Sequence, residues 1–257
     1  MDDRNILILA ATEMEATPLL EIAVTGRETT SRAGRRIVEG KHGSQDFRLI
    51  ITGPGSINCT QALAAELENN HPRLVLQTGI AGVFRETGLR IGDIAVADCE
   101  TCIHTGVEDP WSPLKNAPLP FDLVSGTPST RQGVFPINRT LSRHALDLLS
   151  RRFLRKKCRV MKGPFITVST VTATRERARA LFSSFSPCME AMEGSAAAHV
   201  AALYNTDFLE IRCGSNYAGI RDKEKWNIPL ATQRACRAAA FLLDTSLPGS
   251  NNKPDTP

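Results

Sequence analysis

The sequence contains few aromatic residues and little excess of charge for its length. Aromatic residues make up 5% of its 257 residues, and the formal net charge is +4 at pH 7. Proteins that bind nucleic acid or membrane surfaces generally present a much stronger basic surface. We therefore expect no nucleic-acid partner and no membrane partner. Small or mildly acidic ligands remain candidates.

Long apolar runs are also missing, and so is a regular cysteine framework. No window approaches the roughly 18 apolar residues that a membrane span needs. The opening MDDRNILILAATEMEA places acidic residues on both sides of a short apolar stretch, which is unlike a secretion signal. Seven cysteines, an odd number scattered over a long chain, fit reduced thiols better than disulfides. Together these features predict a soluble cytoplasmic protein.

One cysteine pair has a spacing that metal and redox sites use. Cys99 and Cys102 form CETC, and His104 follows. A second ligand pair is missing, and the surrounding GDIAVADCETCIH is typical of a strand, where positions three apart point to opposite faces. We therefore expect neither a metal site nor a cofactor. The densest basic run, 151–159, is interpreted as a solvated helix end rather than a polyanion site.

Short β-type apolar runs alternate with longer helical segments along the chain. The predicted strands are 5–10, 47–52, 74–79, 94–98, 165–170 and 207–213. The predicted helices are 57–68, 141–152, 175–182, 194–204 and 230–243. Nearly continuous apolar strands that alternate with helices indicate a sheet covered on both faces. The predicted fold class is therefore α/β.

The same pattern predicts a single domain over residues 1–246. Residues 116–140 are rich in Pro, Gly, Ser and Thr and lack periodicity, which is typical of a long loop or lid. Residues 247–257 have the composition of a disordered tail.

An acidic residue stands at an unexpected place in AMEGSAAAHV, residues 191–200. Glu193 precedes a helix that is small and apolar on nearly every side, so the helix should pack closely on the sheet. One interpretation is a simple helix start, because carboxylates are favoured at helix N-termini. The other is a ligand site, because open α/β sheets bind ligands at the carboxyl edge of their strands. Both interpretations stay open at this point.

Three stretches in register carry a resemblance to a known family. They are ILILAATEMEATPLL, QTGIAGVFRETGLRIGDIAVAD and MEGSAAAHVAALYNTDFLEIRCGSN. The sequence resembles the nucleoside phosphorylase and nucleosidase superfamily, especially the hydrolytic branch typified by methylthioadenosine/S-adenosylhomocysteine nucleosidase. A fourth stretch, SNYAGIRDKEKWNIPLA, is most similar to the futalosine hydrolases of the menaquinone pathway. The resemblance covers most of residues 5–245.

The resemblance implies a three-layer α/β/α fold around a central twisted mixed β-sheet, usually in a homodimer. It also implies that water cleaves the N-glycosidic bond of a small purine nucleoside without a cofactor. Within the futalosine hydrolases, the substrate is futalosine and the released base is hypoxanthine.

The resemblance also assigns roles to particular residues. The water-activating glutamate falls on Glu15, with the neighbouring Glu13 as an alternative. The ribose-holding pair falls on Met192 and Glu193, and an arginine near the attacking water falls on Arg212. Ile80 and Ser215 are assigned as further substrate-binding positions. No residue that would stack on the base can be assigned in 171–174.

Asn216 occupies the position where adenine-specific nucleosidases have an aspartate. A side-chain amide can donate to the two acceptors of a 6-oxopurine, N7 and O6, but asparagine can also pair with adenine. Asn216 could instead be a turn residue after a strand. The released base therefore stays open between hypoxanthine and adenine.

The sequence favours water over phosphate as the nucleophile. The first loop, ATEMEA, is acidic where a phosphorylase would hold phosphate, and two nearby carboxylates would repel a dianion. The alternatives are a nucleosidase acting on methylthioadenosine/S-adenosylhomocysteine or 6-amino-6-deoxyfutalosine, and a non-catalytic nucleoside-binding protein. Arg221, Lys223 and Trp226 are candidates for the remote end of the substrate, although the segment also fits an ordinary charged surface.

Overall fold

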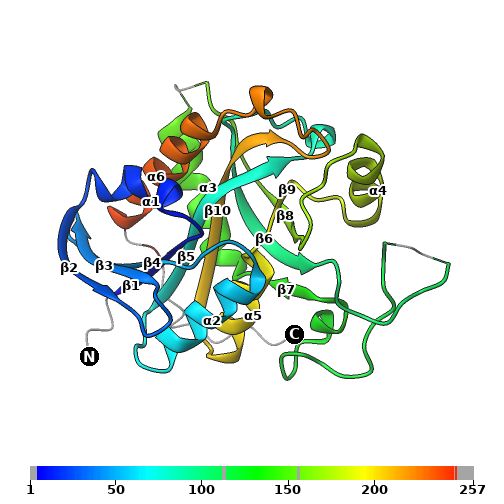
Figure 1. Ribbon diagram of the computed structural model, residues 1–257, viewed down its shortest axis with the longest axis horizontal. Coiled ribbons are helices and arrows are strands. Elements are labelled where there is room, and N and C mark those ends of the chain that lie inside the picture. The colour runs from blue at the N-terminus through cyan, green and yellow to red at the C-terminus, as the bar shows by residue number, and fades with distance from the viewer. Residues whose placement is uncertain (1–4, 112–113, 155–156, 246, 248–257) are drawn as a thin grey trace.

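The computed structural model describes residues 5–111, 114–154, 157–245 and 247. Its centre is a mixed β-sheet with helices on both faces (Figure 1). The strands are β1 (Ile6–Ala10), β2 (Val24–Thr30), β3 (Arg36–His42), β4 (Gln45–Ile51), β5 (Leu74–Val83), β6 (Ile94–Cys102), β7 (Val134–Pro136), β8 (Val160–Thr167), β9 (Met189–Ala191) and β10 (Asp207–Tyr217). The α-helices are α1 (Glu13–Leu20), α2 (Ser56–Leu67), α3 (Arg139–Phe153), α4 (Arg175–Phe185), α5 (Gly194–Leu203) and α6 (Ile228–Leu243). The predicted α/β class with a central mixed sheet is confirmed.

The sheet bends back on itself around β5. The strand order is β10-β6-β8-β9-β5-β1-β4-β3-β2, and β10 also pairs with β5. The β1–β4, β1–β5 and β5–β10 pairs are parallel, whereas β10 runs antiparallel to β6. The carboxyl ends of β1, β5 and β10 therefore meet at one edge of the sheet, which is where open α/β sheets bind ligands.

The core lies on both faces of the sheet, as β1 illustrates. Ile6 and Ile8 belong to one apolar cluster, which also includes residues of α1, α3 and α6. Leu7 and Leu9 belong to the cluster on the other face, which includes residues of α2 and α5. Because successive side chains of a strand point to opposite faces, a strand buried on both faces is apolar throughout. This explains the continuous apolar run in the sequence.

The structure contains elements that the sequence pattern did not predict. All six predicted strands and all five predicted helices are present with shifted ends, but β2, β3, β7, β9 and α1 were missed. Residues 116–140 are mostly irregular, as predicted, yet they include the 3-10 helix Pro128–Gln132 and β7, which pairs with β6. Leu247 is buried against the core, one residue beyond the predicted domain boundary. Residues 248–257 of the predicted tail lie outside the described residues.

Several predictions concern thiols, metals and membranes. All seven cysteines are free. Cys99 and Cys102 lie on β6, and within the described residues no group of three or more His, Cys, Asp or Glu side chains is placed to hold a metal ion. In the same part of the chain, no helix combines the length and the apolar composition required to cross a bilayer.

Candidate active site

The turn after β1 directs one of its two glutamates into the protein. Thr12 caps α1, and its hydroxyl accepts a hydrogen bond from the backbone N–H of Glu15. The Glu15 side chain is 4% exposed and accepts hydrogen bonds from the Thr12 hydroxyl and the Ile80 N–H, each at 2.9 Å. Glu13 is exposed and pairs with Arg36 at 2.6 Å. The two acids therefore have opposite environments although they lie on the same helical turn.

Close packing against β5 holds the Glu15 carboxylate in place. A Cβ added to Gly79 would lie 2.5 Å from Glu15 Oε1 and 2.9 Å from Arg212 Nη1. Glycine is therefore required at this position, because any side chain would displace both groups. The carboxylate and the guanidinium consequently meet over the backbone of β5.

Arg212 on β10 connects the acidic residues of the site. Its side chain is 1% exposed; Nε donates to Glu210 at 2.8 Å and Nη2 donates to Glu193 at 3.2 Å. Burial alone would lower the pKa of its guanidinium. The carboxylates of Glu210, Glu193 and Glu15 outweigh that effect, so the pKa is raised above its ordinary value. The arginine remains a buried cation.

Glu193 occupies the N-cap position of α5, but its side chain does not cap the helix. One carboxylate oxygen accepts from the Gly55 N–H at 2.9 Å, and the other accepts from Arg212. The helix-start interpretation is therefore right for the backbone and wrong for the side chain. Each carboxylate oxygen has a second lone pair, so Glu193 can still accept hydrogen bonds from a ligand.

Electrostatics distinguish Glu15 from an ordinary surface carboxylate. Burial raises its pKa, and the negative charge of Glu193 adds to the rise. The Arg212 charge and the Ile80 N–H oppose this change, but the net pKa lies above the usual 4.5. A raised pKa in a buried carboxylate is typical of a group that takes up a proton during catalysis.

A second layer of acids lies behind Arg212, and the sequence reasoning missed it. Glu100 on β6 and Glu210 on β10 are both fully buried, and the space next to Gly194 is filled by one oxygen from each. Thr167 donates to the other oxygen of Glu100 at 2.7 Å. Burial, followed by the nearby Glu210 charge, raises the pKa of Glu100 well above its ordinary range. The geometry fits a carboxylic acid that shares its proton with a carboxylate.

The sequence does carry a signal for part of this layer. Glu210 and Arg212 are two residues apart in FLEIR, so on a strand their side chains lie on the same face. A charged pair with this spacing inside an apolar strand indicates a buried ion pair. Glu100 has no such local partner, because its neighbours come from other strands.

Asn216 lies within β10, which makes the turn interpretation of this residue wrong. Its amide oxygen accepts from the Ser215 hydroxyl at 2.7 Å, and its Nδ2 donates to the Tyr217 carbonyl at 3.3 Å. Ser215 thereby orients the amide. Of the two Nδ2 hydrogens, only one has a hydrogen-bond acceptor within the described residues.

The remaining predicted residues fall into two groups. Ile80 and Met192 are near the acids: Ile80 supplies the N–H to Glu15, and Met192 directly precedes Glu193. Arg221 instead lies over the Trp226 ring at 5.4 Å, and Lys223 is exposed in the 3-10 helix Lys223–Lys225. These contacts fit the surface interpretation of this segment.

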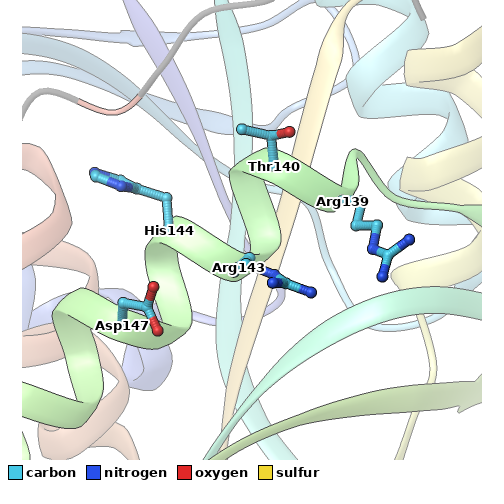
Figure 2. A pocket seen from close by; sticks show the side chains of 5 residues that line it. All are labelled: Arg139, Thr140, Arg143, His144 and Asp147. Carbon is cyan, nitrogen blue, oxygen red and sulfur yellow. The ribbon is translucent and has the colours of Figure 1, made fainter. Parts of the chain in front are cut away.

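A pocket of about 400 Å³ lies elsewhere, along α3. Figure 2 shows that its lining side chains all come from this one helix. They are Arg139, Thr140, Arg143, His144 and Asp147. None of them belongs to the acidic cluster, so this pocket is separate from the candidate site.

Comparisons with known proteins agree with this architecture. Residues 5–248 match the model of the family described as "Phosphorylase superfamily". A futalosine hydrolase from Thermus thermophilus is 29% identical, and the match covers 92% of this chain and 94% of the relative. A futalosine hydrolase from Acidothermus cellulolyticus is 32% identical, over 76% of this chain and 74% of the relative.

A solved structure shows the same fold at low sequence identity. The S-adenosylhomocysteine nucleosidase of Streptococcus pyogenes, in complex with 5-methylthiotubericidin, has a TM-score of 0.79 and 21% identity. The match covers 96% of this chain and 99% of that chain. The family match and the relatives at about 30% identity show that the chain belongs to the phosphorylase superfamily, and within it to the N-glycosidic hydrolases.

Proposed function

We propose that this protein is a futalosine hydrolase that uses water to release hypoxanthine and dehypoxanthine futalosine, as a step of menaquinone biosynthesis. One observation carries the chemistry: two buried carboxylates, Glu15 and Glu193, flank the same buried guanidinium of Arg212. The names of the two relatives at about 30% identity support the choice of substrate.

Glu15 is the proposed general base. Cleavage of a ribosyl C–N bond builds positive charge on the sugar and negative charge on the departing base, as in glycoside hydrolysis. A carboxylate that takes the proton of the attacking water contributes about 10²- to 10⁴-fold. Burial and a raised pKa support Glu15, and the ion pair of exposed Glu13 with Arg36 argues against Glu13. The Thr12 hydroxyl and the Ile80 N–H hold the carboxylate, and the nearby charge of Arg212 orients the water next to it.

Glu193 and Met192 are the proposed ribose-binding pair. A carboxylate can accept hydrogen bonds from two adjacent hydroxyls, and the Gly55 N–H and Arg212 fix the orientation of Glu193. The flexible thioether of Met192 suits contact with the face of the sugar. Ile80 and Ser215 complete the proposed substrate contacts, with Ser215 acting through the amide that it orients.

Asn216 is the proposed partner of the leaving purine. Its remaining Nδ2 hydrogen can donate to N7 or O6 of the base and stabilise negative charge there. An amide cannot transfer a proton, so the base leaves as an anion stabilised by this hydrogen bond and then takes up a proton from water to give hypoxanthine.

Water is the better nucleophile for this site. The charge of Arg212 is already matched by Glu210 and Glu193, and Glu15 adds a further carboxylate. A phosphate dianion would meet an excess of negative charge at short range. This supports hydrolysis and argues against phosphorolysis.

The test is a direct comparison of substrates. Purified protein is incubated with futalosine, methylthioadenosine and inosine, each with and without phosphate, and the released base is identified by chromatography. The proposal predicts hypoxanthine from futalosine at a rate independent of phosphate. Adenine release from methylthioadenosine alone, or a strict phosphate requirement, would contradict it.

A second candidate is hydrolysis of an adenine nucleoside, namely methylthioadenosine/S-adenosylhomocysteine or 6-amino-6-deoxyfutalosine. The observation that favours it is the amide of Asn216, which can pair with adenine through both its atoms. A third, a non-catalytic nucleoside-binding protein, would show thermal stabilisation by nucleosides without any base release.

We also infer a homodimer and a cytoplasmic location. The resemblance to nucleosidases supports the dimer. Seven free cysteines support a reducing compartment.

A further inference from the structure

A buried glutamate that the proposed mechanism does not use lies across the sheet from Asn216. Glu190 is the register partner of Gly82 on β5, and Gly82 is in turn the register partner of Asn216 on β10. The three residues form one row across neighbouring strands. Because paired residues of a sheet present their side chains on the same face, Glu190 and Asn216 flank the position where Gly82 has no side chain.

Distances show that both functional groups border this space. A Cβ added to Gly82 would lie 3.0 Å from Glu190 Cγ, 3.3 Å from Glu190 Oε1 and 3.5 Å from Asn216 Nδ2. The row therefore presents a carboxylate on one side and an amide donor on the other. Glycine is required between them, because a side chain at this position would press against Glu190 and contact Asn216.

The hydrogen bonding of Glu190 is incomplete. The side chain is 3% exposed, and Oε1 accepts the Thr172 N–H at 3.2 Å. Within the described residues, Oε2 has no hydrogen-bond partner. Burial raises the pKa of Glu190, although Thr172 and the Arg177 charge act to lower it. A buried carboxylate oxygen without a partner is costly, so its presence in the fold requires an explanation.

We propose that Glu190 determines base specificity by accepting the N1–H of a 6-oxopurine, opposite the amide of Asn216. This inference rests on the proposed function as a purine nucleosidase. A 6-oxopurine presents two neighbouring acceptors, N7 and O6, and beside O6 the N1–H donor. Asn216 donates to N7 or O6, and the carboxylate of Glu190, whose Oε1 borders the space at Gly82, accepts from N1–H.

The same arrangement disfavours adenine. Adenine N1 is an acceptor, so it would face the carboxylate without a hydrogen between them. Sites built to pair with a particular polar group discriminate strongly against analogues that lack it, because a buried group is then left unpaired. Glu190 thus resolves the ambiguity that Asn216 alone leaves open.

The first experiment uses the wild-type protein and free bases. Hypoxanthine, 1-methylhypoxanthine and adenine are compared as ligands by calorimetry. Hypoxanthine should bind about 10- to 100-fold more tightly than either of the others, as expected for one hydrogen bond to a charged group. Equal binding of all three bases would overturn the inference. This measurement needs no turnover and no variant.

The second experiment uses Glu190→Gln, with Glu66→Gln as a matched control. Glu66 is a buried glutamate on α2 that pairs with Arg48, far from β9 in the sequence. The measured quantity is the ratio of kcat/KM for futalosine to kcat/KM for 6-amino-6-deoxyfutalosine. Glu190→Gln should lower this ratio about 10- to 100-fold. The amide N–H of the new glutamine can donate to N1 of adenine, but it would face the N1–H of hypoxanthine, donor against donor. Glu66→Gln should leave the ratio unchanged.

The outcomes separate this inference from the proposed function. An unchanged ratio in an active, folded Glu190→Gln protein would overturn the role of Glu190 and leave the hydrolase intact. If the wild-type protein released no base from any of the nucleosides, the proposed function would be overturned. The calorimetric comparison would still decide the role of Glu190. A purely structural role would reduce both kcat/KM values equally.

Discussion

At the scale of single residues, environment rather than residue type distinguishes the acids of this protein. Glu13 and Glu15 lie two positions apart, yet one forms a surface ion pair and the other is buried beside Arg212. Glu100 is buried more completely still, next to another carboxylate. Burial raises the pKa of both Glu15 and Glu100; the Arg212 charge opposes the rise at Glu15, and the Glu210 charge adds to it at Glu100.

The raised pKa of Glu15 predicts the acidic limb of the pH profile. The base works as a carboxylate, so kcat/KM for base release should fall as the pH drops through the raised pKa. As the pH is lowered, activity should therefore begin to fall before the pH reaches 4.5, the usual pKa of a glutamate. The measurement is a pH–rate profile, with circular dichroism to show that the fold persists. Constant kcat/KM down to pH 4.5 would contradict this assignment.

The two fully buried glutamates should respond differently to the same substitution. Glu100→Gln should change the free energy of unfolding by less than about 1.5 kcal/mol, because an amide replaces a protonated carboxyl that donates to Glu210. Glu210→Gln removes the partner of a buried guanidinium and should cost about 3–5 kcal/mol.

Urea denaturation of both variants at neutral pH tests this contrast. Each variant serves as the control for the other, because both substitutions are isosteric and both sites are fully buried. Equal destabilisation, or the reverse order, would show that the proton is not held on Glu100.

At the scale of elements, the site depends on where strands end and on which of their positions are glycine. β5 carries Gly79 beneath Glu15 and Gly82 beside Asn216, so the same strand makes room for both halves of the site. β10 carries Glu210, Arg212 and Asn216 over seven residues. These two strands are register partners along almost their whole length.

A single methyl group on β5 should therefore disturb catalysis. Gly79→Ala would push its Cβ against Glu15 and Arg212, and a displacement of about 1 Å can cost about 10²-fold in rate. Gly26→Ala on the exposed β2 is the matched control, because its nearest neighbour would be the Glu39 carbonyl at an ordinary 3.5 Å. We expect loss of kcat in the first variant and wild-type kcat in the second. Full activity of Gly79→Ala would contradict the tight packing of Glu15.

Hydrophobic pattern predicted some elements well and others not at all. The apolar runs of β1 and β5 were recognisable because both faces of these strands are buried, and that of β4 because Phe47, Leu49 and Ile50 are buried. β2 reads VTGRETT and is almost wholly exposed, so it has no apolar face to detect. β9 has only three residues, too few to show a period. α1 contains Pro18 and was interpreted as an acidic turn.

At the scale of the whole molecule, the fold collects residues that are far apart in the sequence. Sequence motifs selected Glu15, Glu193 and Arg212, which the structure brings together, and Asn216, whose role as a partner of the base stays a prediction. They could not reveal Glu100 or Glu190, because burial depends on neighbours from other strands. A glutamate without a charged partner on its own strand cannot be recognised as buried from the sequence alone.

The proposed homodimer is a prediction about the molecule as a unit. Size-exclusion chromatography with light scattering should give twice the mass of one chain. A measured mass equal to one chain at micromolar concentration would contradict the proposed dimer, without affecting the assignments within the chain.

The central claim is that Glu15 deprotonates the attacking water. Its most direct test is hypoxanthine release from futalosine by Glu15→Gln compared with Glu13→Gln, both verified as folded. We predict that Glu15→Gln lowers kcat by about 10²- to 10⁴-fold, whereas Glu13→Gln keeps the wild-type rate. Full activity in Glu15→Gln, or a loss confined to Glu13→Gln, would contradict the account.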